Sequence, residues 1–216
     1  MSRCGSNCDE RPDAMLKLYH CKGARSLRAL WALEEMGLPY ELVSMQFPPR
    51  VFHKDYKEIN PLGTVPALVD GAATLTESAG VCQYLAEKYG PTPLGVSKDE
   101  ADYALYVNWL HRSDATLTFP QTLVLRYTLL EPEERRLPQA AADYRQWFLA
   151  RWRSVEAALG ERDYLCADRF TMADIAVGYA LYLARTLAID EAFTPNVMKW
   201  WDKISARPAF IRANEK

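Results

Sequence analysis

Two neighbouring stretches of the sequence carry residue types that could hold a small peptide. Val65-Pro66 lies in a short apolar run, and Glu77-Ser78 precedes an apolar pattern with helical spacing. A proline cannot donate to a sheet ladder, so strand pairing should end on one side at Pro66. The proline also holds Val65 extended, which leaves the backbone N–H and C=O of Val65 free to pair with an extended peptide.

Glu77-Ser78 could hold the carboxylate of such a peptide. A helix N-terminus offers unpaired N–H groups and a partial positive charge to an anion. A free strand edge beside a carboxylate cradle describes a site for a small anionic peptide. The same pattern is equally typical of an ordinary β-hairpin followed by a helix, so spacing alone leaves both interpretations open.

Hydrophobic periodicity predicts the elements that must position these residues. The expected strands cover residues 15–19, 40–45, 64–69 and 74–76, and the expected helices cover 26–36 and 79–89, with a loop or short helix over 47–59. Gly37 and Pro39 end the first of these helices. The resulting βαβ-ββα order is the thioredoxin-like α/β plan.

The second half of the chain has a different character. Gly90-Pro91-Thr92-Pro93-Leu94-Gly95 breaks the pattern, and almost no strand signal follows Lys98. Helices are expected over 99–118 and 138–159, so this half predicts an all-α helical bundle. The expected organisation is a disordered N-terminal extension (1–14), an α/β domain (15–90), a linker (91–97) and an all-helical C-terminal domain (98–216).

A helix-start signal stands out near the C-terminus. Thr171 can cap a helix while Asp174, three residues later, reaches back to the Thr171 backbone. Phe170 and Ile175 would form the accompanying hydrophobic staple. This arrangement predicts a folding device rather than a chemical site.

The stretch VPALVDG…LTES…VCQYL resembles the glutathione-binding half of the cytosolic glutathione S-transferase family. The segment Phe170–Val177, Trp200-Trp201 and residues 206–210 resemble the C-terminal domain of that family, which extends the resemblance over about residues 15 to 212. The resemblance implies a cis peptide bond at Pro66 and pairing of Val65 with the cysteinyl part of glutathione. It also implies that Glu77 and Ser78 hold the γ-glutamyl end, with glutathione as co-substrate and no metal.

Such an enzyme must hold glutathione as a thiolate, although a free thiol has a pKa near ~8.5. A hydrogen-bond donor, a positive charge or a helix N-terminus lowers that pKa. The candidates are the polar residues from the end of the first strand to the start of the first helix, Tyr19, His20, Cys21, Arg25 and Ser26. The main ones are Ser26, Tyr19 and Arg25, and a mixed disulfide through Cys21 is an alternative. Ser26 is preferred, because its hydroxyl would act with the positive end of the helix. Gly-Ala-Arg-Ser-Leu also resembles the Gly-Ala-Cys-Ser-Leu loop of beta-class members, but Arg25 replaces their catalytic cysteine.

The resemblance also implies roles for residues outside these two stretches. His53 and Lys54 lie in the loop where some members of the family contact the glycine carboxylate. His111, Arg112 and Asp114 lie where the family forms its acceptor pocket or dimer groove. A solvated or interfacial face is the competing interpretation for these three residues.

Composition limits the class of protein and its partners. The 216 residues are 49% hydrophobic and 25% charged, with a net charge of −2 and five scattered cysteines. This composition is typical of a soluble globular protein in the cytosol and argues against a nucleic-acid or membrane surface. We expect a homodimeric glutathione transferase that attacks a small electrophilic, partly apolar acceptor. A glutathione-dependent isomerase, a disulfide reductase or peroxidase, and a non-catalytic binding module remain alternatives.

Overall fold

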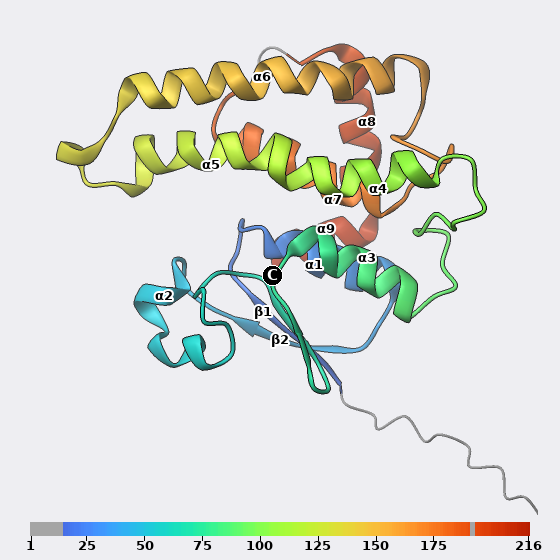
Figure 1. Cartoon of the computed structure of the whole chain (residues 1–216), viewed down its shortest axis with the longest axis horizontal. Helices are drawn as coiled ribbons and strands as arrows, with labels where there is room; N and C mark the ends of the chain where they lie inside the picture. The colour runs from blue at the N-terminus through green and yellow to red at the C-terminus, as the bar shows by residue number, and fades with distance from the viewer. Residues whose placement is uncertain (1–14, 191–192) are drawn as a thin grey trace, which may run out of the picture.

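A computed structural model describes residues 15–190 and 193–216 of the chain. A small sheet with its flanking helices forms one part of the molecule, and a larger set of helices lies against it (Figure 1). The extension expected over residues 1–14 lies outside the described residues. Within those residues, no helix combines the length and the apolar character needed to cross a membrane.

The sheet has four strands in the order β2-β1-β3-β4. β1 pairs in parallel with β2, and β3 pairs antiparallel with both β1 and β4. This mixed sheet agrees with the predicted α/β plan. The strands are β1 (Leu16–His20), β2 (Tyr40–Ser44), β3 (Ala67–Asp70) and β4 (Ala73–Leu75).

Alternation along β1 sends its side chains to two different layers. Leu16, Leu18 and His20 are buried on one face, against α1 (Ser26–Met36) and α3 (Ser78–Lys88). Tyr19 points to the other face, where its ring lies 5.3 Å from that of Tyr56. Tyr56 belongs to the short helix η1 (Lys54–Glu58), which follows α2 (Pro49–Phe52).

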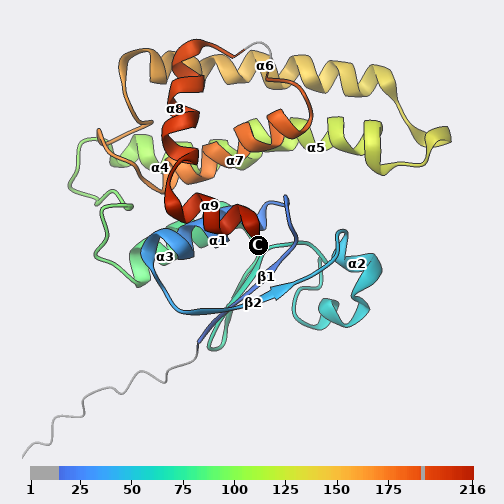
Figure 2. The same cartoon turned by 180° about the vertical axis from the view of Figure 1, so that it is seen from behind.

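The rest of the chain is helical, as predicted, but contains more helices than periodicity alone identified. Residues 113–118 and 126–130 form π-helical segments on either side of α5. Figure 2 shows the last helix, α9, lying along α1. The elements are α4 (Tyr103–Arg112), η2 (Ser113–Thr118), α5 (Phe119–Leu125), η3 (Arg126–Leu130), η4 (Glu133–Arg135), α6 (Pro138–Glu161), α7 (Met172–Thr186), α8 (Pro195–Ser205) and α9 (Pro208–Glu215).

The connection between the two halves is firmly attached to the helical part. Arg169 donates hydrogen bonds to the carbonyls of Pro93 at 2.9 Å and Gly95 at 2.8 Å. The N–H of Met172 donates to the Leu94 carbonyl at 2.8 Å, and the Leu94 side chain is buried. The predicted linker segment therefore packs against the helices instead of acting as a flexible tether.

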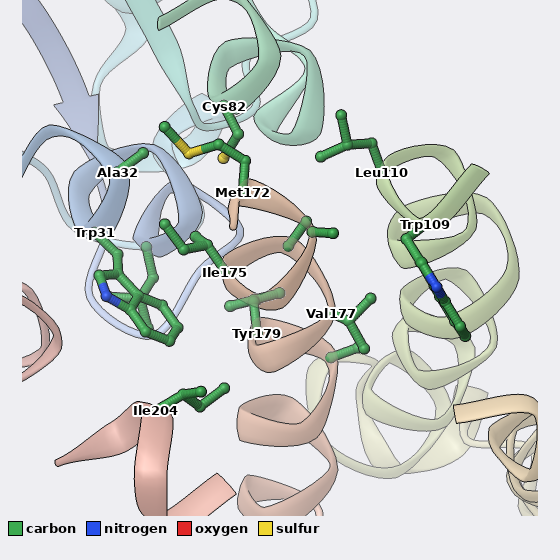
Figure 3. Close-up of a cluster of buried hydrophobic side chains, with 14 of the residues drawn as sticks. Trp31, Ala32, Cys82, Trp109, Leu110, Met172, Ile175, Val177, Tyr179 and Ile204 are labelled. Atoms are coloured by element: carbon green, nitrogen blue, oxygen red, sulfur yellow. The ribbon is translucent and has the colours of Figure 1, made fainter. Parts of the chain in front are cut away.

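One hydrophobic core runs through both halves, with α7 at its centre (Figure 3). Gly178 marks the closest approach in this core. A Cβ atom at this position would lie 2.9 Å from Ile204 and 3.2 Å from Trp31. The missing side chain at Gly178 thus lets α1 and α8 pack directly onto α7.

The predicted capping box is present at the start of α7. Both oxygens of Asp174 accept hydrogen bonds: Oδ2 from the Thr171 N–H at 2.9 Å, and Oδ1 from the Leu165 N–H at 3.1 Å and the Trp200 Nε1–H at 3.0 Å. Asp174 is fully buried. It therefore ties together three segments of the helical half, which is more than helix capping alone requires.

Asp174→Ala should lower the free energy of unfolding by about 3–5 kcal/mol, because it leaves several buried donors without a partner. Urea unfolding monitored by circular dichroism measures this loss. The control is Asp143→Ala on the exposed face of α6, where the carboxylate accepts a hydrogen bond from Gln139 of the same helix; the loss for this variant should stay below about 0.5 kcal/mol. Equal losses for the two variants would contradict the role given to Asp174.

Candidate functional site

The Val65–Pro66 turn lies directly before β3 and contains a cis peptide bond. The predicted strand over 64–69 is therefore too long at its start, because β3 begins only after Pro66. The Thr64 carbonyl accepts hydrogen bonds from Tyr56 Oη and Asn60 Nδ2, each at 2.7 Å, which fix the turn. In the part of the chain that the structure describes, no hydrogen bond involves the Val65 backbone. Its N–H and C=O are thus open to an extended ligand.

The N-terminus of α3 lies on the same side of the sheet as α1. Glu77 occupies the N-cap position without a side-chain hydrogen bond to the helix, and it is exposed. Ser78, the first helical residue, is buried, and its Oγ accepts a hydrogen bond from Arg28 Nη1 at 2.9 Å. The first N–H groups of α3 therefore face a position suited to a carboxylate, with a cation close behind them.

Arg28 on α1 is the most heavily bonded side chain in this region. It is fully buried, and every nitrogen of its guanidinium donates at least one hydrogen bond. The guanidinium also lies 4.6 Å from the Tyr179 ring centre. The acceptors are Ala176 O at 2.8 Å, Ser78 Oγ at 2.9 Å, Asp114 Oδ1 at 3.0 Å, Ser113 O at 3.0 Å and Thr118 Oγ1 at 2.7 Å.

Two arginines donate hydrogen bonds to the same oxygen of Asp114. Its Oδ1 accepts from Arg25 Nε at 2.8 Å and from Arg28 Nη1 at 3.0 Å. Burial acts to raise the pKa of Asp114, but the charges of Arg28 and Arg25 outweigh it and hold that pKa below its usual range. Asp114 is therefore a carboxylate at neutral pH, with 31% of its side chain exposed.

The π-helical turn η2 supplies the acceptors on the helical side. Its backbone N–H of Phe119 bonds to the Asp114 carbonyl, five residues earlier. This wider turn brings the Ser113 carbonyl within reach of both Arg28 Nη2 at 3.0 Å and Thr118 Oγ1 at 2.7 Å. Single π turns inside α-helices are frequent at functional sites.

Ser26 is the first residue of α1 and is fully buried. Its Oγ lies 2.8 Å from His20 Nδ1 and accepts the Cys21 N–H at 3.2 Å. These bonds close the loop between β1 and α1. The role expected for Ser26 as the thiol donor stays a prediction; in this structure its hydroxyl is buried and bonded to His20 and Cys21.

Arg25 is another of the predicted candidates. It precedes α1, and 31% of its side chain is exposed. Its guanidinium is held by Asp114 at 2.8 Å and by Thr122 Oγ1 at 2.7 Å, so a positive charge is fixed at the start of a helix. By contrast, burial raises the pKa of Cys21 to about 11, so Cys21 is a neutral thiol and a poor nucleophile.

Tyr19, His53 and Lys54 share one pocket of about 710 Å³ between β2 and the α2–η1 segment. His53 is held there by its Nε2, which accepts the Gln46 N–H at 3.0 Å. Tyr19 thus faces this pocket rather than the Arg25–Asp114 pair.

His111 and Arg112 do not join Asp114, although they precede it closely on α4. His111 is exposed, and the Arg112 guanidinium lies over the Trp109 ring at 4.7 Å. Of these three residues, Asp114 is the one that bonds to Arg25 and Arg28.

Arg28 is the functional residue that sequence reasoning missed. The sequence feature that could have identified Arg28 is its position as the single charged residue in the run Leu27–Leu33. All residues of this run are buried in the structure. A charge at such a position is buried only when it is paired. The partners lie 50 to 148 residues away in sequence, so no local pattern could identify them.

The buried His20 allows a test of the bonds that close the loop between β1 and α1. Burial lowers its pKa from 6.5 to about 4, whereas the unfolded chain protonates near the ordinary value. The unfolded state therefore binds more protons between these values, so stability should fall by up to roughly 3 kcal/mol as the pH drops from about 6.5 to 4. His20→Asn, which keeps a group able to bond to Ser26, should lack this part of the pH dependence.

Chemical denaturation at several pH values measures how the free energy of unfolding changes with pH. His111→Asn is the matched control, because His111 is exposed; it should keep the slope of the parent protein. A His20→Asn slope equal to that of the parent would contradict the assignment.

The comparisons with known proteins agree with this geometry. Residues 24–88 match the model of the glutathione S-transferase N-terminal domain, and residues 135–208 match that of the C-terminal domain. Glutathione S-transferase 3 of Zea mays is 33% identical, covering 91% of this chain and 92% of its own. Glutathione S-transferase 3 of Schizosaccharomyces pombe is 28% identical, covering 94% and 88%.

Solved structures give the same result. A sphingomonad glutathione S-transferase complexed with glutathione superimposes with a TM-score of 0.81, at 26% identity, over 92% of this chain and 97% of that one. The matches extend over both the sheet and the helical part. The chain belongs to the glutathione S-transferase family.

Proposed function

We propose that this protein is a glutathione transferase that binds glutathione between the Val65 edge and the start of α3. The observation that supports this most strongly is the uncapped N-terminus of α3 with the buried Arg28 behind Ser78. The open backbone at Val65 is a second supporting feature. Val65 would pair with the cysteinyl backbone, while Glu77 and Ser78 would hold the γ-glutamyl end. His53 and Lys54 would take the glycine carboxylate.

The chemistry is the attack of the glutathione thiolate on an electrophilic, partly apolar acceptor. The thiol proton leaves to solvent, the sulfur forms a bond to an electrophilic carbon, and that carbon gives up a leaving group or a π-electron pair. At neutral pH only a few per cent of a free thiol is ionised. A fixed positive charge beside the sulfur increases that fraction.

We propose Arg25 as the residue that stabilises the thiolate, with Tyr19 as the second candidate. Arg25→Ala should reduce the thiolate fraction of bound glutathione at pH 7 about tenfold, and raising the pH should restore part of the rate. Arg25→Lys should keep much of the effect, because the charge remains. The measurement is the thiolate absorbance of bound glutathione across pH.

Tyr19→Phe and Ser26→Ala complete the series. If Arg25 acts alone, the titrations of both variants should overlay that of the parent, and Ser26→Ala should lose only stability through its loop bonds. A shifted titration for Tyr19→Phe with an unchanged one for Arg25→Ala would transfer the role to Tyr19. Formation of the thioether in proportion to the glutathione consumed identifies the reaction as a transfer.

Ser78→Ala should weaken glutathione binding by roughly 1.5–3 kcal/mol, because it removes a hydrogen bond to a charged group. Calorimetry gives the affinity, and thermal unfolding verifies the fold. The control is Ser154→Ala on α6, since the Ser154 hydroxyl donates to the Arg151 carbonyl of its own helix. The same affinity for glutathione in the parent and Ser78→Ala would remove Ser78 from the site.

We further propose a homodimer, with His111 and Arg112 at the groove between subunits. Exposed apolar side chains on α2 and the segment before it support this, since Phe47, Val51 and Phe52 are between 42% and 55% exposed. Light scattering measures the mass.

The free, buried cysteines Cys21, Cys82 and Cys166 fit a reducing compartment, for which we propose the cytosol.

We propose residues 15–90 and 98–216 as the two domains, joined by 91–97. The end of α3 at Lys88 and the start of α4 at Tyr103 support these boundaries.

A further inference from the structure

We propose that a groove between the end of α1, the start of β2 and the end of α9 binds a small organic carboxylate with an apolar body. The groove has a volume of about 580 Å³, which lies in the range of small-molecule pockets. Figure 2 shows α9 along α1, the contact beside which the groove lies. None of the residues proposed to hold glutathione lines it. The site is therefore a second one, and it does not depend on the proposed function.

The floor of the groove is apolar. Gly37 ends α1 in the left-handed region, at φ +62°, and the chain turns back so that the Leu38 N–H donates to the Leu33 carbonyl at 3.2 Å. Leu33 is fully buried, whereas Leu38 and Leu42 are only half-buried against the core. Pro39 completes this surface. These side chains leave an apolar area open beside the turn, suited to an aromatic ring or a short hydrocarbon.

The wall of the groove is polar and belongs mainly to α9. Arg212 and Lys216 are four residues apart, so both side chains lie on one face at the end of this helix. Arg212 Nε donates to Glu34 Oε2 at 2.7 Å, and Lys216 Nζ donates to Glu34 Oε1 at 2.5 Å. The Tyr40 hydroxyl also donates to Glu34 Oε1 and accepts from Lys216 Nζ at 2.7 Å. One carboxylate thus holds both cations beside the apolar floor.

The cluster of Arg212, Lys216 and Glu34 by itself carries a net positive charge, because two cations share one carboxylate. Glu35, the next residue along α1, does not compensate it, since Glu35 is paired with Arg207 at 2.6 Å. The two cationic side chains are 51% and 40% exposed, whereas that of Glu34 is 10% exposed. The uncompensated charge therefore faces the solvent side of the groove.

Donors for a second carboxylate remain on both cations. In the described part of the chain, Arg212 Nη1 has no hydrogen-bond partner, and Lys216 uses two of its three donors. Burial acts to raise the pKa of Glu34, but hydrogen bonds from Lys216, Tyr40 and Arg212 outweigh it and lower that pKa to about 2. Glu34 is therefore fully ionised and has no proton to offer. An incoming carboxylate must bind to the free donors of Arg212 and Lys216, with its apolar body on the leucines.

The competing explanation is that these ion pairs only fasten α9 to α1. In that case the groove binds no carboxylate, and substitutions change stability alone. Three probes separate the two explanations: 2-naphthoate, which has the charge and the apolar body, 2-naphthamide, which lacks the charge, and acetate, which lacks the apolar body. Two-dimensional ¹H–¹⁵N NMR of the full-length protein locates binding, and saturating S-methylglutathione occupies the proposed glutathione site throughout.

In the parent protein, 2-naphthoate should shift the amide signals of Gly37, Leu38 and Leu42 in a saturable manner. 2-Naphthamide should bind there at least about tenfold more weakly, the equivalent of one hydrogen bond to a charged group. Acetate should produce no saturable shift at these amides, because it leaves the apolar floor empty.

Two substitutions in the cluster should change the affinity for 2-naphthoate in opposite directions. Arg212→Gln removes an exposed donor and its charge, so it should weaken binding about tenfold or more. Glu34→Gln removes the competing negative charge, so it should strengthen binding about three- to fivefold. Lys216→Gln should also weaken binding, and it serves as the second variant if Glu34→Gln does not fold.

Arg135→Gln is the matched control, because Arg135 is an exposed arginine that pairs with Glu131 at the other end of the helical half. It should leave binding of 2-naphthoate unchanged. The absence of a saturable shift at the groove, equal binding of 2-naphthoate and 2-naphthamide, or weaker binding by Glu34→Gln would each overturn the proposal. Glutathione turnover should be the same in the parent and Arg212→Gln, so failure of this site leaves the proposed function intact.

Discussion

The structure depends on one buried positive charge, that of Arg28. A guanidinium taken out of water is costly unless its hydrogen bonds are replaced, and here acceptors in α3, α7 and η2 replace them. Asp114 supplies the counter-charge. Because these acceptors belong to both halves of the chain, the two halves can satisfy Arg28 only in one relative arrangement. The charge therefore specifies how the helical part sits on the sheet.

The backbone of the helical part supplies some of the acceptors that the buried Arg28 requires. A regular α-helix through residues 113–118 would leave its carbonyls bonded along the helix axis. The π turn instead lets the Ser113 carbonyl accept from Arg28, with Thr118 bonding to both. Gly178 makes a similar contribution one turn further along α1, since its missing side chain lets α7 approach Trp31. The π turn η2 and the missing side chain at Gly178 of α7 are thus both explained by the way these helices pack against α1.

The sequence predicted what local patterns determine. The bounds of α1, the order of the sheet elements and the capping box at Thr171 and Asp174 agree with the structure. The strand expected from Thr64 begins only after Pro66. The bond between Ser26 and His20 depends on how the loop between β1 and α1 closes, which residue spacing alone does not determine. Arg28 gave a clear local signal as a lone charge in an apolar run, but its partners come from folding.

The charges around the site explain why Arg25 and Arg28 have different tasks although they share Asp114. One carboxylate cannot neutralise two guanidinium groups, so the cluster of Arg25, Arg28 and Asp114 by itself carries a net positive charge. Arg28 is shielded from solvent, and each nitrogen of its guanidinium already donates a hydrogen bond. It therefore acts by fixing the positions of its partners and through the electrostatic potential of its charge. Arg25 keeps about a third of its side chain exposed, so its charge is the one that reaches solvent. The buried arginine orients the Asp114 carboxylate, and that carboxylate in turn fixes the position of the exposed arginine.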